Sequence, residues 1–166
     1  MSSRRAFLVL SALLVAGCGF QLRGTAQVPF ETLYVPGASA GMALDLKRNL
    51  EAGTRARVVN DPQAAQALIQ FFEEAREREI LSLTGTGRVR EFQLRYRVRW
   101  RLHDGKGGEF VPQNTIQLTR DVTFNDTEIL AKEQEEQLLY RDMQADMVQQ
   151  IMRRLAAAER LKPKAQ

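Results

Sequence analysis

The only cysteine of this 166-residue chain, Cys18, carries the clearest chemical signal in the sequence. It follows an apolar run from Ala6 to Ala16 and a basic start at Arg4 and Arg5. The run is too short to span a bilayer, which takes about 20 apolar residues. A basic start, a short apolar stretch and small residues before a cleavage site are typical of a secretory signal peptide. Because a cysteine stands at that site, the pattern indicates a lipoprotein signal, and we expect residues 1–17 to be cleaved.

The expected mature chain, residues 18–166, is long enough for one domain with one core. Its Cys18 thiol would receive a diacylglycerol, and the new amino group would receive an acyl chain. A buried methylene contributes roughly 0.8 kcal/mol, and stable anchoring takes more than one chain. Three chains would therefore hold the domain on a membrane. The alternative is an ordinary signal peptide in which the cysteine is incidental.

Composition argues against several other function classes. One cysteine cannot form a disulfide within the chain, and the single histidine, His103, argues against His-based metal sites. The net charge is +4, and it falls to about +2 once the signal and its two arginines are removed. We therefore expect no nucleic-acid partner and no cofactor beyond the covalent lipid on Cys18.

No combination of side chains predicts an enzyme. The serines and the histidine fit no nucleophile motif. The neighbouring carboxylates Asp121, Asp126 and Glu128 could suggest acid–base chemistry or a Ca²⁺ site, but residues of this kind commonly cap helices and end strands. We expect the chain to have no catalytic residues.

Arginines form the other unusual pattern. Six of them occur between residues 88 and 101, where Glu91 is the one acidic residue. They could form a solvated face that keeps a sheet from aggregating. They could instead bind an anion or a partner, since arginine pairs bidentately with phosphate and carboxylate. The sequence leaves both interpretations open for Arg88, Arg90, Arg95, Arg97, Arg99 and Arg101.

Strict alternation predicts that most of these arginines lie on a strand. From Phe92 to Leu102 apolar and polar residues alternate, so the apolar side chains share one face and the last four arginines share the other. A glycine-rich turn follows, and a return strand from Thr115 to Phe124 alternates in the same way. Two antiparallel strands that are apolar on one side need a cover on that side.

Two predicted helices supply the cover. The first runs from Gly41 to about Ala52 behind a possible cap at Ser39. The second is capped by one of residues 125–127 and runs to about Leu161. Its apolar face steps by three or four residues along the helix. The residues of that face are Tyr140, Met143, Met147, Ile151 and Leu155.

The remaining segments are shorter or ambiguous. Short strands are expected over 30–35 and 57–59, next to turn residues. Residues 64–83 have a composition that favours a helix, whereas the alternation of Ala67, Ile69 and Phe71 with their neighbours favours a strand. We predict an α+β fold in which two helices pack on one face of a mostly antiparallel sheet.

Several short motifs resemble those of the LptE family of lipopolysaccharide-assembly lipoproteins. The most specific is Cys18-Gly19-Phe20-Gln21-Leu22-Arg23-Gly24 directly after the signal. Arg90-Glu91-Phe92-Gln93-Leu94 after a glycine-containing turn and Ala131-Lys132-Glu133 at the start of the last helix are similar too. So are Gln149-Gln150-Ile151 and Arg153-Arg154-Leu155 within that helix.

The resemblance implies a fold and a location. The family has a mixed four-stranded sheet with two helices on one side, which favours a strand over residues 66–83. Its members are lipoproteins of the outer membrane on the periplasmic side. Gly19 rather than an aspartate follows the cysteine, so the inner-membrane retention signal of enteric bacteria is absent, which supports the same location.

The resemblance also implies partners. Family members plug the β-barrel of LptD, assist its assembly and bind lipopolysaccharide. Basic residues in the loop before the third strand and near the start of the last helix are linked to that binding, and Arg88, Arg90 and Lys132 best match those places. The turn Thr84-Gly85-Thr86-Gly87 departs from the family pattern, and the first arginine comes later. The other hypotheses are a generic outer-membrane lipoprotein that binds another envelope component and a lipid-tethered hydrolase.

Overall fold

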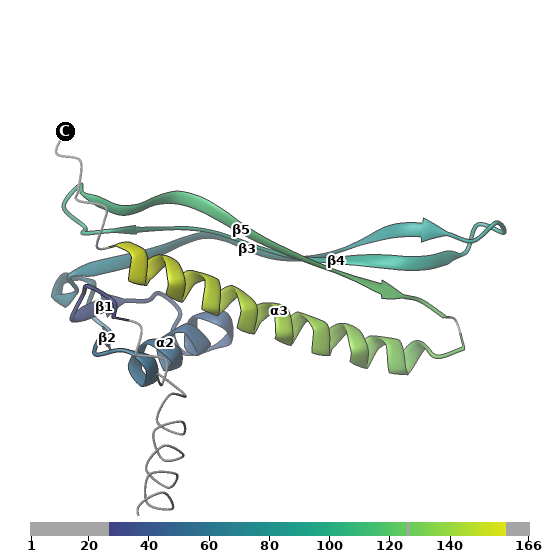
Figure 1. Cartoon of the computed structure of the whole chain (residues 1–166), viewed down its shortest axis with the longest axis horizontal. Coiled ribbons are helices and arrows are strands. Elements are labelled where there is room, and N and C mark those ends of the chain that lie inside the picture. Colours follow the sequence, from purple (N-terminus) through teal and green to yellow (C-terminus); the bar gives the residue numbers. More distant parts are fainter. Residues whose placement is uncertain (1–26, 126, 159–166) are drawn as a thin grey trace, which may run out of the picture.

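Three long antiparallel strands and one long helix dominate the structure, a computed structural model that describes residues 27–125 and 127–158 (Figure 1). The expected signal peptide and Cys18 lie outside these residues. The elements in chain order are β1 (Thr32–Tyr34), α2 (Gly41–Gly53), β2 (Arg57–Val59), the 3-10 turn η1 (Pro62–Ala64), β3 (Ala67–Leu83), β4 (Val89–His103), β5 (Glu109–Thr123) and α3 (Ile129–Ala157).

The sheet is mixed, as expected, with strand order β2-β1-β3-β4-β5. The short strand β1 pairs in parallel with both β2 and β3, whereas β3, β4 and β5 are antiparallel neighbours. The four strands implied by the family resemblance are corrected to five. The additional member is the three-residue β2, which pairs with β1 from Thr32↔Arg57 to Tyr34↔Val59.

The ambiguous segment forms a strand, β3, despite its helix-favouring composition. Its first residues lie between β1 and β4, so their backbone groups pair on both sides, and Ala67 and Ile69 are buried. Tertiary pairing and burial outweigh a helix preference that amounts to a few tenths of a kcal/mol per residue.

A β-bulge at Phe72 changes which side chains of β3 face the helices. Phe71 pairs with Trp100 and Glu73 pairs with Arg99, so Phe72 has no partner in β4. Because side chains alternate along a strand, one extra residue moves everything after it to the opposite face. Beyond the bulge, the odd-numbered residues of β3 share a face with the polar residues of β4.

Both helices pack on one face of the sheet, as predicted, with α3 along β4 and β5 and α2 against α3 and β2 (Figure 1). On α3 the expected stripe is buried, apart from Tyr140, which packs at its edge. Trp100, Tyr96 and Leu94 of β4 are fully buried beneath the helices. No helix within the described residues is long and apolar enough to cross a membrane.

The predicted helix caps are wrong in detail. The N-cap of α2 is Ala40 rather than Ser39, and it makes no side-chain bond, because the chain enters this helix through a turn closed by Gly37. The N-cap of α3 is Glu128, also without a side-chain bond. Asn125 instead accepts hydrogen bonds from the backbone and hydroxyl of Thr127. These turns give the backbone amides just before each helix their hydrogen-bond acceptors.

Candidate functional site

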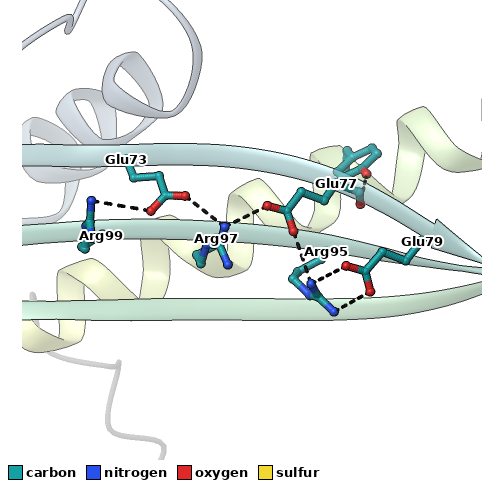
Figure 2. Close-up of polar contacts among 7 residues, drawn as sticks. Glu73, Glu77, Glu79, Arg95, Arg97 and Arg99 are labelled. Atoms are coloured by element: carbon teal, nitrogen blue, oxygen red, sulfur yellow. Dashed lines mark hydrogen bonds and ion pairs between the residues drawn. The ribbon is translucent and has the colours of Figure 1, made fainter.

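The arginines of β4 are neutralised by glutamates of β3 on the face that points away from the helices (Figure 2). Arg95 binds both carboxylate oxygens of Glu79, at 2.7 and 2.8 Å. Arg97 lies between Glu73 at 3.0 Å and Glu77 at 2.8 Å. This arrangement pairs two arginines with three carboxylates, although the Nε atoms of Arg95 and Arg97 are buried without a hydrogen-bond partner. Figure 2 shows the chain of contacts continuing from Glu73 to Arg99.

The Phe72 bulge creates this charge ladder, which we define as Glu73, Glu77 and Glu79 with Arg95, Arg97 and Arg99. Glu73 and Glu77 pair in register with Arg99 and Arg95, and the small Ala75 stands opposite Arg97. Arg97 can therefore reach the glutamates diagonally on either side. The hydrogen bonds that Arg95 donates to Glu79 are the main cause of the raised pKa of Arg95.

Arg101 continues the same pattern toward the other end of β4. It contacts Glu109 of β5 at 3.0 Å and Gln70 of β3 at 2.8 Å. The polar row of β4 is thus paired with carboxylates of the neighbouring strands β3 and β5. The interpretation of Arg95, Arg97, Arg99 and Arg101 as an open cationic face does not agree with this pairing.

The three residues linked to ligand binding belong to the β3–β4 hairpin and the start of α3, which lie at the same end of the molecule (Figure 1). Arg88 closes the hairpin turn, since its carbonyl accepts from the Thr84 amide at 2.7 Å. Arg90 is a bulge residue of β4, and its carbonyl accepts from the Phe124 amide at 2.8 Å. Bulges often re-aim side chains near functional sites.

Lys132 reaches the same end from α3 but is more constrained than expected. Its ammonium donates to Thr123 at 3.1 Å and to Glu135 at 2.8 Å, and its side chain is 19% exposed. Thr123 directly precedes Phe124, whose amide donates to the Arg90 carbonyl. The start of β4 and the start of α3 therefore lie at the same end of the domain, as the binding hypothesis requires, while Lys132 also fastens the helix to β5.

A cavity of about 150 Å³ opens between α3 and the helix-facing side of the sheet at this end. Phe92, Val122, Phe124 and Ile129 supply its apolar walls. The rings of Phe92 and Phe124 meet edge to face with centroids 5.3 Å apart. The polar lining consists of Arg78, Thr123, Lys132, Glu133 and Glu136.

Large apolar side chains are exposed around the cavity. Ile80, Leu81 and Leu83 on the hairpin are 58%, 47% and 55% exposed. Ile129 and Leu130 at the start of α3 are 50% and 70% exposed. Sequence reasoning treated the hairpin residues only as strand formers. The apolar run Ile80-Leu81-Ser82-Leu83 could have indicated these exposed side chains, because it stands beside a glycine-rich turn, where polar residues are usual.

A second polar cluster holds the layers together farther from this end. The Tyr96 hydroxyl donates to Glu74 at 2.6 Å, and burial raises the pKa of Tyr96. The Arg76 guanidinium lies over the rings of Tyr96 and Tyr140, at 5.1 and 5.6 Å from their centroids. Arg76 also donates to Gln144 of α3. These contacts join the sheet to α3 and are structural.

Neither a metal centre nor a catalytic arrangement emerges from the described part of the chain. No group of three His, Cys, Asp or Glu side chains there could hold a metal ion. His103 accepts a hydrogen bond from the Gly105 amide at 3.1 Å, and burial lowers its pKa. The histidine therefore shapes the β4–β5 turn.

Comparisons with known proteins point to one family. Residues 27–155 match the model of the family LptE, described as lipopolysaccharide-assembly. The LPS-assembly lipoprotein LptE of Photorhabdus laumondii subsp. laumondii is 26% identical over 151 residues, which cover 89% of this chain and 82% of that protein. Its counterpart in Yersinia enterocolitica is 29% identical over 152 residues, covering 89% and 72%.

Two solved lipoprotein structures are similar to this chain. The solution NMR structure of lipoprotein B from Nitrosomonas europaea has 46% identity and a TM-score of 0.73, covering 84% of this chain and 91% of that one. The crystal structure of a minor lipoprotein from Acinetobacter baumannii has 27% identity and a TM-score of 0.62, covering 82% and 96%.

Proposed function

This chain belongs to the LptE family of lipopolysaccharide-assembly proteins, and on that premise we propose that it is a non-enzymatic outer-membrane lipoprotein that binds lipopolysaccharide at the end formed by the β3–β4 hairpin and α3. One observation carries the proposal. Lys132, which is far in sequence from Arg88 and Arg90, lies at the same end of the molecule as these two arginines, and exposed apolar side chains lie beside them. A lipopolysaccharide carries phosphates next to acyl chains, so it suits a surface that is basic and apolar at once.

The pairing within the charge ladder strengthens this assignment. Each arginine of the ladder contacts a glutamate, so a phosphate would have to displace a carboxylate to bind there. Arg88 and Arg90 belong to the hairpin, where the side chains of Leu81 and Leu83 are exposed. Because the anionic head group is joined to acyl chains, we place it at the hairpin end and not on the middle of the outer sheet face.

The binding test compares two charge-reversed variants of equal charge. Arg88→Glu, Arg90→Glu and Lys132→Glu change the proposed site together. Arg48→Glu, Arg55→Glu and Arg57→Glu make the same change in exposed side chains of α2, β2 and the segment between them, at the other end of the molecule. Lipopolysaccharide affinity should fall strongly in the first variant and little in the second, and added salt should weaken binding to the wild type.

Thermal melting on the same samples separates binding from folding. Lys132 holds Thr123 and Glu135, so a double variant, Arg88→Glu with Arg90→Glu, is measured as well. Equal affinity in the wild type and the site variants, with equal melting temperatures, would contradict the proposed site.

The lipid anchor is the second part of the proposal. Cys18 would carry the acyl chains that hold the domain on the periplasmic side of the outer membrane. Cys18→Ser should abolish incorporation of labelled palmitate, because an alcohol cannot replace the thiolate in diacylglycerol transfer. Equal labelling of wild type and variant would refute the anchor.

The third part concerns the partner, a β-barrel of the LptD type in which the domain acts as a plug. Barrel lumens are polar, and the outer sheet face offers a neutral polar surface: the charge ladder, together with exposed residues of β5 such as Gln117 and Thr119. The tagged lipoprotein should co-purify with one barrel in mild detergent. An unrelated lipoprotein carrying the same tag is the control, and a lipoprotein that always runs alone would contradict the plug role.

A further inference from the structure

We infer that the cavity between α3 and the sheet receives an acyl chain of the same amphiphile whose anionic head group the hairpin arginines bind. The inference rests on the proposed function and adds a second subsite to it. It follows from the lining of the cavity, from the charges at its mouth and from the apolar surface beside it.

The interior of the cavity suits hydrocarbon. Phe92, Phe124, Val122 and Ile129 form its walls, and Val122 is 5% exposed. Its volume is about 150 Å³. An enclosed cavity of about this volume that is lined by apolar side chains alone binds a six-carbon ring, so the volume here is sufficient for hydrocarbon beside these apolar walls. The end of a fatty-acyl chain has the same chemistry and a smaller cross-section.

Carboxylates at the mouth disfavour a phosphate inside the cavity, whereas Lys132 at its rim belongs to the proposed head-group site. Arg78 is paired with Glu136 at 3.0 Å, and Lys132 with Glu135 at 2.8 Å. Glu133 adds a further carboxylate to the lining. An anionic group entering here would meet these carboxylates, whereas an uncharged chain would not. The head group and the chain of one ligand therefore have separate places, at the hairpin and in the cavity.

The exposed aliphatic side chains connect the two places. Ile80 pairs in register with Phe92, whose ring forms a wall of the cavity. Leu83 lies opposite Val89, next to Arg88 and Arg90. An acyl chain that leaves the cavity can thus follow apolar surface toward the basic hairpin. A soluble domain rarely leaves such a group of aliphatic side chains exposed without a ligand or partner.

The test uses the expected mature chain, residues 18–166, with Cys18→Ser so that its own lipid cannot occupy the cavity. Dodecanoate is the probe for a single acyl chain. Its addition should shift the methyl resonances of Val122 and Ile129 in NMR spectra and leave those of Val35, in the core at the other end, unchanged. Shifts of equal size throughout the chain would overturn the inference.

A matched pair of variants then tests the subsite with lipopolysaccharide. Ile129→Gln removes an apolar wall from the first residue of α3, and Leu138→Gln makes the same change at a similarly exposed residue outside the cavity. Ile129→Gln should weaken lipopolysaccharide binding about tenfold, since each buried methylene changes an affinity roughly fourfold. Leu138→Gln should leave the affinity unchanged, and both variants should melt like the wild type.

Fully deacylated lipopolysaccharide separates this inference from the proposed function. It should bind more weakly than the intact form, be insensitive to Ile129→Gln and remain sensitive to Arg88→Glu with Arg90→Glu. If intact and deacylated forms bind equally and only the arginine variant weakens them, the acyl subsite is wrong and the proposed function stands. If the wild type binds neither form, the proposed function fails.

Discussion

Deleting Phe72 should leave the fold intact, although the residue lies near the middle of the longest strand. Phe71 and Glu73 already pair with consecutive residues of β4, Trp100 and Arg99. Removing the bulge residue therefore restores a regular ladder without moving any other pair. The charge ladder and the buried face of β4 should keep their partners.

The expected cost is small. Phe72 is 39% exposed, so its loss removes about 1 kcal/mol of apolar burial. Its ring also lies 6.0 Å from the Arg99 guanidinium and 5.7 Å from that of Arg101, and each such contact contributes roughly 0.5 kcal/mol at an exposed site. Ordering one residue fewer recovers about 1 kcal/mol of backbone entropy. The free energy of unfolding should therefore fall by about 1 kcal/mol.

Deleting Arg97 is the control, because β4 is paired on both sides there without a bulge. One half of the strand would have to turn over, which exposes Leu94 and Tyr96, both fully buried now. Each loses roughly 1.5–3 kcal/mol of burial, and Arg95 would turn inward without its glutamates. The total approaches the whole stability of a typical domain, about 5–15 kcal/mol.

Urea denaturation followed by circular dichroism measures both deletions, with Phe72→Ala as a variant that keeps the bulge. We expect the Phe72 deletion to unfold close to Phe72→Ala and the Arg97 deletion to be unfolded in buffer. Two deletions with equal effects would refute the reasoning from the strand phase.

Three further outcomes follow from the structure. Changing Glu73, Glu77 and Glu79 together to Gln should free Arg95, Arg97 and Arg99, so that the variant elutes from a heparin column at higher salt than the wild type; unchanged elution would mean that the ladder is not what neutralises these arginines. Burial raises the pKa of Tyr96, so the fold favours the neutral phenol: its contribution to stability is full below the ordinary pKa of about 10 and is lost as pH rises toward the folded value. Tyr96→Phe should therefore reduce the fall in urea midpoint between pH 9 and pH 11, and an identical fall in both proteins would contradict this. Trp100→Ala should lower the free energy of unfolding by about 3–5 kcal/mol, because the side chain is fully buried between sheet and helices; a loss below about 1 kcal/mol by the same denaturation assay would show that the core is not packed there.

The elements with strong hydrophobic periodicity could be predicted from the sequence alone. The alternation from Phe92 to Leu102 predicted β4 and its buried face, because successive side chains of a strand point to opposite faces. The steps of three and four in the last helix predicted which residues of α3 pack on the sheet. The short motifs after Cys18, at the start of β4 and in α3 were enough to indicate the family, which the comparisons confirm.

Pairing between segments distant in the sequence is visible only in the tertiary structure. In the sequence, Arg95 and Arg97 are surrounded by other arginines, and their carboxylate partners lie about 20 residues earlier in a segment that also suits a helix. One bulge residue, Phe72, sets which face those glutamates take, and no local pattern marks it. The cavity likewise forms where Phe92, Val122 and Ile129 converge from three elements. Alternation is a local property of the chain, whereas strand phase and register depend on the neighbours that each strand meets.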